Sequence, residues 1–498
     1  MGFLTEMRIR LSPTLAVLLL LGALLPAGAG GASLAPQGLQ TAVADGYGYD
    51  LPELQRAFAR TRAAGTSAVR VYVSWRQIAP KGSARPSGFD PRNPGDPQYT
   101  WTWPDNIVRT ATAAGLAPII SIDDAPEWAQ VGPQPSVFSR GVRPNARDFG
   151  EFATALATRY SGRFAGLPRV RYFQALNEPN LQGFLWPQYD TPWEQPVTAR
   201  SKPVSPDAYA ELVNPFADAV HAVRRDNLVV AGGLAPFGRF LARDQGVMPL
   251  VFMRQMLCLT SRDRPRRNCN RRLRFDVWSM HPFTGGDARH RASVPGNVSL
   301  GNLSEMRRTL LAAVASGHVR PTGGIRFWIT EFAWNTNPPF SRGVPLNLHA
   351  RWVAEALYES WRQGVSLFTW FQFRDEPTYE FGFHQQSGLY FRCAQGMGCD
   401  TPKPSFTALR FPFVAYRAGR AVSFWGRTPF GRPATLRIEQ RRGAGWRRLA
   451  TVRANRYGIF TGRVTTAASG DLRARAGGES ALPFSLRRPR DRVIDPPL

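Results

Sequence analysis

Two glutamates stand directly after short apolar runs of the kind that form buried strands. Glu178 follows the run in VRYFQALNEPN at 170–180, where Pro179 stops the strand, and Glu331 follows the run in FWITEFAWN at 327–335. Retaining hydrolysis of a glycosidic bond requires one carboxyl group that donates a proton and a second that attacks from about 5–5.5 Å away. The pair therefore predicts an acid/base (Glu178) and a nucleophile (Glu331), provided that the fold brings the two strand ends together.

Seven runs rich in Val, Ile and Phe, and a weaker one near the start, indicate buried parallel strands. They lie at 41–44, 68–73, 118–122, 170–176, 228–231, 275–280, 326–330 and 365–371, with helical patterns at 52–64, 105–114, 149–160, 206–224, 303–315 and 347–362. Eight βα units in series predict an α/β fold, a (β/α)8 TIM barrel, which we assign to residues 35–415. A doubly wound sheet is the alternative, but residues 45–49 (DGYGY) lack its GxGxxG turn.

The character of the chain changes after the predicted barrel. Short strand patterns at 435–440, 446–452, 459–464 and 471–476 alternate with glycine-containing turns, which predicts a small β-sandwich over residues 417–487. This sandwich either caps the barrel or binds a polymer. The Arg- and Pro-rich end at 488–498 is expected to be a flexible tail.

The two glutamate motifs resemble those of the clan A glycoside hydrolases, over about residues 39 to 413. In that clan an Asn-Glu-Pro after strand four carries the acid/base, which here is Asn177-Glu178-Pro179, and the nucleophile follows strand seven, as in Ile329-Thr330-Glu331. The resemblance is nearest to the cellulase-like members of family five and the xylosidase-like members of family thirty-nine.

The resemblance also implies roles for four further residues. Arg70 would steady the carboxylate of the nucleophile, and Asn177 would bond the sugar 2-hydroxyl. His281 would lie near the nucleophile, and Trp370 would form the floor of the sugar subsite. Two departures concern the family assignment: residues 121–126 lack a histidine common after strand three, and 281–283 read His-Pro-Phe, where many relatives have His-x-Tyr.

Three further side chains, Asp124, Trp128 and Trp334, are predicted to contact substrate, although an aromatic at these positions can equally belong to the core. No GxSxG nucleophile elbow and no HExxH helix is present, and the six histidines are scattered along the chain. We therefore expect a site that needs neither a metal ion nor a cofactor.

The N-terminus resembles a secretory signal, which we assign to residues 1–32. Arg8 and Arg10 precede an apolar run at 15–25, and Ala-Gly-Ala at 27–29 is a plausible cleavage site; an uncleaved anchor is the alternative. The expected location is extracellular, where disulfides persist. Of the three possible pairings of the four cysteines we predict the local one, 258–269 and 393–399, with a zinc site as the alternative.

The chain carries a formal net charge of +27. A solvated basic surface explains this charge without a function, and attraction to anionic cell-wall polymers or acidic sugars is the functional alternative. Nucleic acid is not expected, because no nucleic-acid motif accompanies the spread charge. The sequence thus predicts a secreted, monomeric, retaining glycosidase that cleaves β-linked O-glycosidic bonds of an oligosaccharide, polysaccharide or glycoside. A non-catalytic carbohydrate-binding barrel is the alternative from another class.

Overall fold

The computed structural model of the protein describes residues 38–45, 53–132, 142–322, 324–377, 385–487 and 489. The predicted signal peptide at 1–32 lies outside these ranges, and so does the predicted tail at 488–498 except for residue 489. Among the described helices, none combines the length and the apolar character that a bilayer crossing requires.

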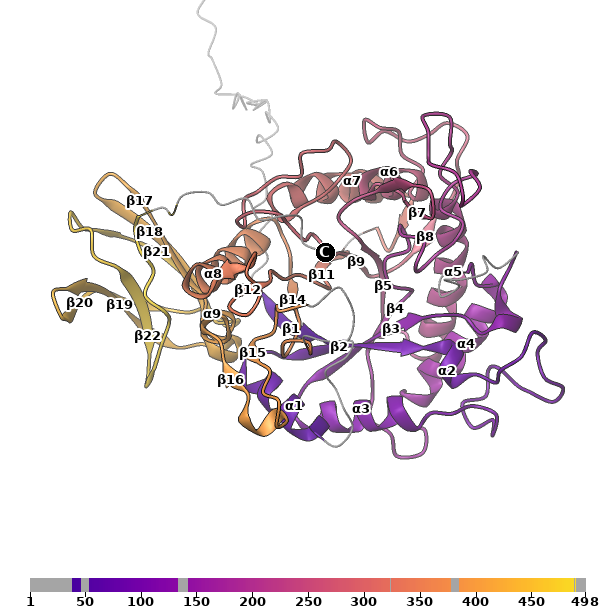
Figure 1. The fold of residues 1–498 in the computed structure, drawn as a ribbon, viewed down its shortest axis with the longest axis horizontal. Coiled ribbons are helices and arrows are strands. Elements are labelled where there is room, and N and C mark those ends of the chain that lie inside the picture. The colour runs from indigo at the N-terminus through magenta and orange to yellow at the C-terminus, as the bar shows by residue number, and fades with distance from the viewer. Residues whose placement is uncertain are drawn as a thin grey trace, which may run out of the picture. The chain divides into compact units, whose positions relative to one another are not determined.

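Eight parallel strands close into a barrel, as predicted (Figure 1). Around the barrel they follow one another in chain order: β1 (Gln40–Ala44), β2 (Ala68–Ser74), β3 (Ala117–Asp123), β4 (Tyr172–Gln174), β5 (Leu228–Leu234), β9 (Val277–Met280), β11 (Arg326–Ile329) and β14 (Leu367–Phe371). The strand β14 pairs with β1 and closes the ring. All eight correspond to runs predicted from the sequence, including the weak first one.

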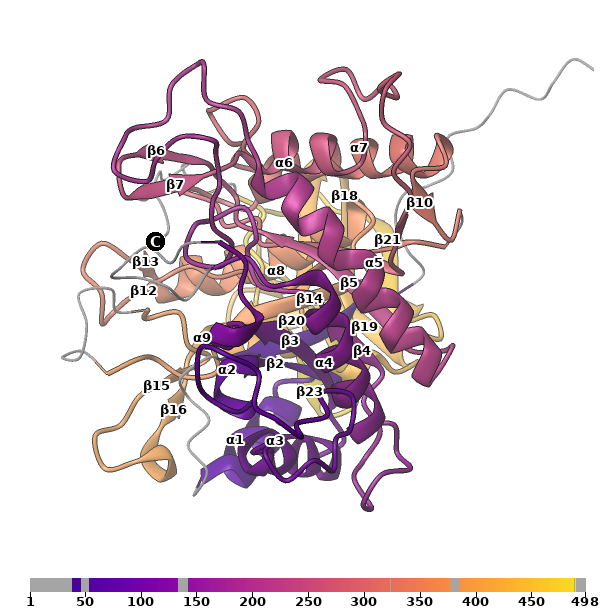
Figure 2. The ribbon, with the colours of Figure 1, turned by 90° about the vertical axis from the view of Figure 1, so that its right-hand side faces the viewer.

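Helices surround the barrel strands, as the two views in Figures 1 and 2 show. Six were predicted: α1 (Leu54–Ala63), α3 (Thr102–Ala113), α4 (Ala146–Arg159), α5 (Ser205–Val223), α7 (Leu303–Ala315) and α8 (Leu346–Arg362). Three shorter ones were not: α2 (Trp75–Ile78), α6 (Pro249–Met256) and α9 (Pro404–Arg410). Short strand pairs occur in the connections: β6 (Arg239–Leu241) with β7 (Asp244–Gly246), β8 (Leu273–Arg274) with β10 (Val319–Arg320), β12 (Thr336–Asn337) with β13 (Val344–Pro345), and β15 (Tyr390–Phe391) with β16 (Thr401–Pro402).

The barrel interior is apolar at one end and polar toward the other. One buried cluster takes an inward side chain from each of seven strands, with Tyr172 of β4 packed against it: Ala42, Ala68, Ile119, Val230, Val277, Trp328 and Leu367. Because side chains alternate along a strand, the residues two and four positions later face the same interior. On β2 these are Arg70 and Tyr72, so the polar residues of this strand point toward the barrel mouth.

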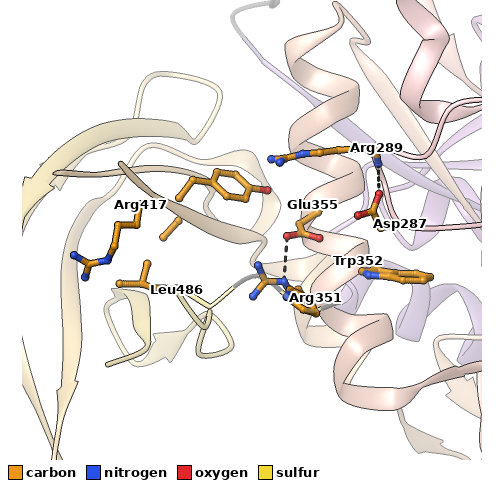
Figure 3. Close-up of a pocket in the computed structure, with 10 residues that line it drawn as sticks. Asp287, Arg289, Arg351, Trp352, Glu355, Arg417 and Leu486 are labelled. Atoms are coloured by element: carbon orange, nitrogen blue, oxygen red, sulfur yellow. Dashed lines mark hydrogen bonds and ion pairs between the residues drawn. The ribbon is translucent and has the colours of Figure 1, made fainter. Parts of the chain in front are cut away.

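Two antiparallel sheets follow the barrel. One consists of β17 (Phe413–Ala418), β18 (Ala421–Arg427) and β21 (Ile459–Thr465), and the other of β20 (Gly445–Arg453), β19 (Thr435–Arg442), β22 (Leu472–Ala476) and β23 (Glu479–Ser480). Strands β19 to β22 match the predicted patterns, whereas β17 and β18 were not predicted. Arg351 of α8 donates to Glu355 of the same helix (3.1 Å) and to the carbonyl of Ser485 (2.8 Å), beside a cavity of about 370 Å³ (Figure 3).

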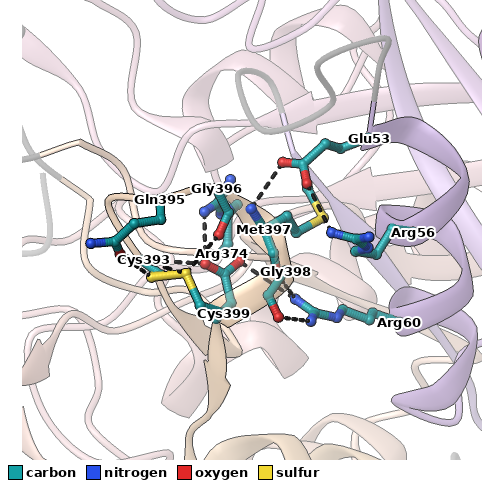
Figure 4. Close-up of a disulfide and its surroundings, with 11 residues drawn as sticks. Glu53, Arg56, Arg60, Arg374, Cys393, Gln395, Gly396, Met397, Gly398 and Cys399 are labelled. Atoms are coloured by element: carbon teal, nitrogen blue, oxygen red, sulfur yellow. Dashed lines mark hydrogen bonds and ion pairs between the residues drawn. A yellow bond between two sulfur atoms is a disulfide. The ribbon is translucent and has the colours of Figure 1, made fainter.

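Both cysteine pairs are joined as predicted, Cys258 to Cys269 and Cys393 to Cys399. The second disulfide closes a short loop that contacts α1 (Figure 4). In that loop the Met397 N–H donates to Glu53 (2.9 Å), and Arg60 of α1 donates to the Met397 carbonyl (2.6 Å). The loop after the last barrel strand is thereby tied to the first barrel helix.

Candidate active site

A cavity of about 830 Å³ lies at the carboxyl ends of the barrel strands, where TIM barrels carry their active sites. Both predicted catalytic glutamates line it, although they are 153 positions apart in the sequence. Asn177 and Asp124, two of the predicted substrate-binding residues, line it as well. The cavity is therefore the candidate active site.

Glu331 is held by two donors from β2. Arg70 Nη1 donates to Glu331 Oε1 at 2.6 Å, and the hydroxyl of Tyr72 donates to the same oxygen at 2.8 Å. Hydrogen bonds from a guanidinium and a phenol stabilise the ionised form of a carboxylate and restrict its orientation. Tyr72 was not predicted from the sequence, although it faces the same side of β2 as Arg70 and strand alternation alone could have identified it.

Arg70 is completely buried and reaches the cavity only through its partners. Its Nη2 donates to Asn177 Oδ1 at 2.6 Å and to Ser121 Oγ at 3.1 Å, and its Nε donates to Gln174 Oε1 at 3.0 Å. The N–H groups of a guanidinium lie in one plane with fixed directions, so one arginine can hold several acceptors in place at once. Arg70 thus positions Glu331 and Asn177 rather than touching a ligand.

Glu178 lies four residues beyond the end of β4 with φ +36°, a left-handed conformation that an L-residue rarely adopts. Its N–H donates to the carbonyl of Gly233 at 3.1 Å. Gly233 has φ +62°, and a Cβ there would meet Gln174 Nε2 at 2.4 Å. Burial raises the pKa of Glu178 to about 7, against the lowering effects of Arg70 and Arg239. A carboxylic acid that keeps its proton near neutral pH can serve as a general acid.

His281 stands between the two glutamates and is fully buried. Its Nδ1 is 2.9 Å from Glu178 Oε1 and 3.5 Å from Glu331 Oε1, and its Nε2 is 3.0 Å from Thr330 Oγ1. Burial lowers the pKa of His281 to about 3, so the imidazole is neutral at ordinary pH. A neutral imidazole beside a threonine hydroxyl can donate to Glu178 in one tautomer and accept from it in the other.

Glu178, His281 and Glu331 form the one cluster of possible metal ligands among the described residues. One ligand atom from each lies within 4.8 Å of the others. This places oxygens of the two carboxyl groups within 4.8 Å, nearer to the roughly 5–5.5 Å between the carboxyl groups of retaining glycosidases than to the roughly 6.5–9.5 Å of inverting ones. Arg70 and Tyr72 already donate to the Glu331 oxygen nearest to His281.

Asp123 and Asp124 follow one another at the end of β3, and both line the cavity. Burial raises the pKa of Asp123 to about 7, opposed by the nearby charge of Arg70. The Oδ1 atom of Asp123 is buried and has no hydrogen-bond partner among the described residues. It is therefore a group that a hydroxyl of a bound ligand can satisfy.

The three predicted aromatic platforms do not line the cavity. Trp370 is completely buried, and its indole N–H donates to the Ser387 carbonyl at 2.9 Å. Because Leu367 of β14 faces the barrel interior, Trp370 faces outward, and Phe371 is the residue of this strand that reaches the cavity. Trp334 is likewise buried, with its N–H bonded to the Thr284 and Gly286 carbonyls.

Trp128, the third of these aromatics, is half-buried beneath Arg85, and its N–H donates to the Pro80 carbonyl at 2.9 Å. Several cavity residues were not predicted as site residues. They are Ser74, Arg76, Gln77, Trp103, Leu181, Phe184, Phe237, Arg239, Phe283 and Phe371. Four of them, Leu181, Phe184, Phe237 and Phe283, stand in loops, where no periodic pattern reveals which side chains turn inward.

No protein-family model matches the sequence, and no curated protein matches it. Solved structures of similar fold include a family 39 glycoside hydrolase from Bacteroides cellulosilyticus WH2, with 15% identity and TM-score 0.48 over 87% of this chain and 82% of that one. A glucosidase from Croceicoccus marinus has 13% identity and TM-score 0.46 over 88% and 94% of the two chains. A family 1 β-glucosidase from Thermotoga maritima has 12% identity and TM-score 0.46 over 75% and 97%.

The first of these structures belongs to family thirty-nine, one of the two families that the sequence motifs resemble. The fold rests on the closed eight-stranded barrel itself, and the function rests on the residues that line its mouth.

Proposed function

We propose that this protein is a retaining β-glycosidase in which Glu178 is the acid/base and Glu331 the nucleophile. The observation that carries the proposal is the contrast between two carboxyl groups whose oxygens lie within 4.8 Å of one another. Burial raises the pKa of Glu178 to about 7, whereas Glu331 accepts hydrogen bonds from Arg70 and Tyr72 that fix its orientation. Double displacement needs one carboxyl that donates a proton and a second, nearby, that attacks the sugar.

In the first step Glu331 Oε attacks the anomeric carbon while the Glu178 proton moves to the glycosidic oxygen, and the aglycone leaves as an alcohol. In the second step the Glu178 carboxylate takes a proton from water, whose oxygen displaces Glu331 from the sugar. Asn177, whose Oδ1 is held by Arg70, presents its amide N–H to the 2-hydroxyl of the bound sugar. His281 can keep a hydrogen bond to Glu178 in both protonation states by changing tautomer.

The test is hydrolysis of a panel of aryl β-glycosides and β-glycan polymers by wild type, Glu178→Gln and Glu331→Gln. A matched control is Glu211→Gln, an exposed glutamate of α5 that pairs with Arg143. We expect wild type and the control to be active and both site variants to lose activity by at least a thousandfold while keeping the circular-dichroism spectrum of the wild type. The first-formed product should keep the β configuration by NMR, and a 2-deoxy-2-fluoro glycoside should label Glu331.

A folded wild type that cleaves nothing, an active Glu331→Gln, or an α-configured first product would each overturn the proposal. An alternative is that Glu178, His281 and Glu331 hold a metal ion. Incubation with a chelator distinguishes this alternative from the metal-free mechanism. Unchanged turnover after chelation supports double displacement by the carboxylates alone. Loss of turnover that a divalent cation restores would favour metal-assisted hydrolysis.

We also propose that the chain is exported by a signal peptide at 1–32 and that residues 35–415 form the catalytic domain, followed by a β-sandwich at 417–487. The two disulfides support an oxidising compartment. Mass spectrometry of protein from the culture medium tests export, with a mature N-terminus expected near residue 30. Recovery of full-length protein with the cell membranes would contradict it.

A further inference from the structure

The two catalytic glutamates divide the rim of the barrel into two unequal arcs. Glu178 follows β4 and Glu331 follows β11, so β5 and β9 lie on one side of the line between them and β14, β1, β2 and β3 on the other. Cavity-lining residues come from both arcs. The two arcs differ in chemistry.

The arc of β14, β1, β2 and β3 is mainly polar. Its cavity-lining side chains include Ser74, Arg76, Gln77, Asp123 and Asp124, beside the aromatic Phe371 and Trp103. Hydroxyl, amide, guanidinium and carboxyl groups provide the hydrogen bonds that sugar hydroxyls need. It also carries the Tyr72 hydroxyl, which holds the nucleophile, so this arc binds the sugar that becomes attached to Glu331.

The opposite arc is apolar. Ala235, Pro236 and Phe237 line the cavity after β5, and Phe283 lines it after β9. The loop after Glu178 adds Leu181 and Phe184, and this loop belongs to the same side because Asn180 Nδ2 donates to the carbonyls of Ala235 and Val247 at 3.2 and 3.0 Å.

Arg239 is the one charged cavity-lining side chain of the apolar arc among the described residues. Its Nη1 is 3.0 Å from Asp244 Oδ1, and its guanidinium lies 5.1 Å from the centre of the Phe237 ring. The ion pair with Asp244 engages one side of the guanidinium, and the stacking holds Phe237 in place. The arc thus offers a leaving group aromatic and aliphatic surface and very few hydrogen-bond partners.

We propose that the leaving-group side of this cavity binds an apolar aglycone, an alkyl or aryl group, and not a further sugar of a polysaccharide. This inference rests on the proposed glycosidase function. Glu178 borders the apolar arc, so the leaving group whose oxygen it protonates lies against that arc. A sugar in this place would leave its hydroxyls without partners, which costs free energy. An alkyl chain or ring would instead bury apolar surface against Phe184, Phe237 and Phe283.

The test compares methyl, butyl and octyl β-glycosides of the sugar that the activity panel identifies with the corresponding disaccharide. We expect KM to fall about fourfold for each methylene until the cavity is filled, following roughly 0.8 kcal/mol per buried CH2. The disaccharide should be a poorer substrate than the octyl glycoside by at least tenfold in kcat/KM. Phe237→Ser should raise KM about tenfold for the octyl glycoside and by a smaller factor for the methyl glycoside, which has no chain to bury against this ring.

The control is Leu241→Ser, which removes an apolar side chain that is 69% exposed on the neighbouring strand β6. It should not alter KM for any of these substrates. Turnover with no dependence on chain length, or with a preference for the disaccharide, would overturn this inference alone. Absence of turnover with every glycoside and polymer would overturn the proposed function itself.

An independent observation concerns the sheet β20-β19-β22. Cross-strand neighbours share a face, and the register pairs Arg437 with Thr451 and Arg475, Glu439 with Arg448 and Arg473, and Arg441 with Trp446. Six arginines therefore gather on one face: Arg437, Arg441, Arg448, Arg453, Arg473 and Arg475. Residues 417–487 hold 15 arginines, no lysine and three acidic residues, a formal charge of +12 out of +27 for the chain.

Much of this charge has no partner among the residues that the structure describes. The guanidinium groups of Arg437, Arg448, Arg453 and Arg475 make no side-chain hydrogen bond or ion pair within the described ranges, and all four are exposed. Arg473 pairs with Glu439 at 2.8 Å, the acidic residue in the middle of this face.

Trp446 is already covered, with Arg473 4.0 Å and Arg441 5.6 Å from its ring centre. The face therefore lacks a free aromatic on which a nucleic-acid base could stack.

We propose that this arginine face binds a carboxylated polysaccharide through repeated guanidinium–carboxylate contacts. The test is binding of polygalacturonate, measured by calorimetry, to wild type, to Arg437→Gln/Arg453→Gln/Arg475→Gln and to the control Arg225→Gln/Arg420→Gln/Arg463→Gln. The control removes the same charge from other exposed positions. We expect the first variant to bind at least tenfold more weakly and the control to stay within twofold of wild type.

Equal weakening in both triple variants would mean that net charge alone attracts the polymer and would overturn the proposal. Tighter binding of single-stranded DNA or polyphosphate than of polygalacturonate would overturn it too. Binding should weaken as salt is added, because exposed charges are screened. Both variants should keep the melting temperature of wild type, since the substituted side chains have no partners to lose.

Discussion

The protonation of Glu178 should govern the pH dependence of catalysis. Its pKa is raised by burial from the usual 4.5 to about 7, so the acid form needed for leaving-group protonation should be half lost at pH 7 and about nine-tenths lost at pH 8. We expect kcat/KM for a glycoside with a poor leaving group to fall above pH 7. A dinitrophenyl glycoside, which leaves without protonation, should show no such fall.

Two variants sharpen this prediction. Glu178→Gln should leave little turnover of the glycoside with the poor leaving group, and its kcat/KM for the dinitrophenyl glycoside should stay level across pH 7, as in wild type. Arg239 lowers the pKa of Glu178, so Arg239→Met should shift the limb to higher pH. A limb centred near 4.5, or one that persists unchanged in Glu178→Gln, would refute the assignment of the acid.

The same shift has a consequence for stability. Because the folded-state pKa of Glu178 is raised, its stabilising contribution is present below pH 4.5 and is lost as pH rises through 7. A shift of this size corresponds to about 3 kcal/mol. Glu178→Gln should therefore gain stability relative to wild type above pH 7 and not at pH 4, by up to this amount in urea unfolding. An equal difference at both pH values would contradict the burial of the charge.

Three further predictions concern residues around the site. Tyr72→Phe removes the hydroxyl that donates to Glu331 at 2.8 Å, and should lower kcat/KM about tenfold, in line with the roughly 1.5–3 kcal/mol of a bond to a charged group, without loss of fold. Lys403→Met leaves the buried carboxylate of Asp375 without the ammonium group that lies 2.6 Å from it in wild type. This should lower the free energy of unfolding in urea by about 3–5 kcal/mol. Replacing both cysteines of the 393–399 disulfide by serine should cost about 2 kcal/mol, with kcat nearly unchanged; a stability equal to wild type would contradict it.

The barrel and its two glutamates could be predicted because a parallel strand is buried on both faces and must be apolar throughout. Pro179 marks the end of the run before Glu178, and a carboxylate that follows the end of a barrel strand lies at the mouth of the barrel. The order of the strands follows from the series of βα units, which has one common closed arrangement. The local cysteine pairs could be predicted for a related reason, since a short separation in sequence already keeps the two thiols close.

The direction of side chains within an apolar strand was not legible from the sequence. In β14, residues 367–371 read LFTWF, and either Trp370 or Phe371 could face the interior; packing of Leu367 inside the barrel decides for Phe371. The bonds from Arg70 and Tyr72 to Glu331 join residues about 260 positions apart.

No local pattern encodes such a contact, because it exists only once the barrel has closed. Sequence alone thus identified the two glutamates proposed to carry the chemistry and the strands after which they stand. The closure of the barrel decided which of them meet, which are buried as supports, and which face of the cavity is polar and which apolar.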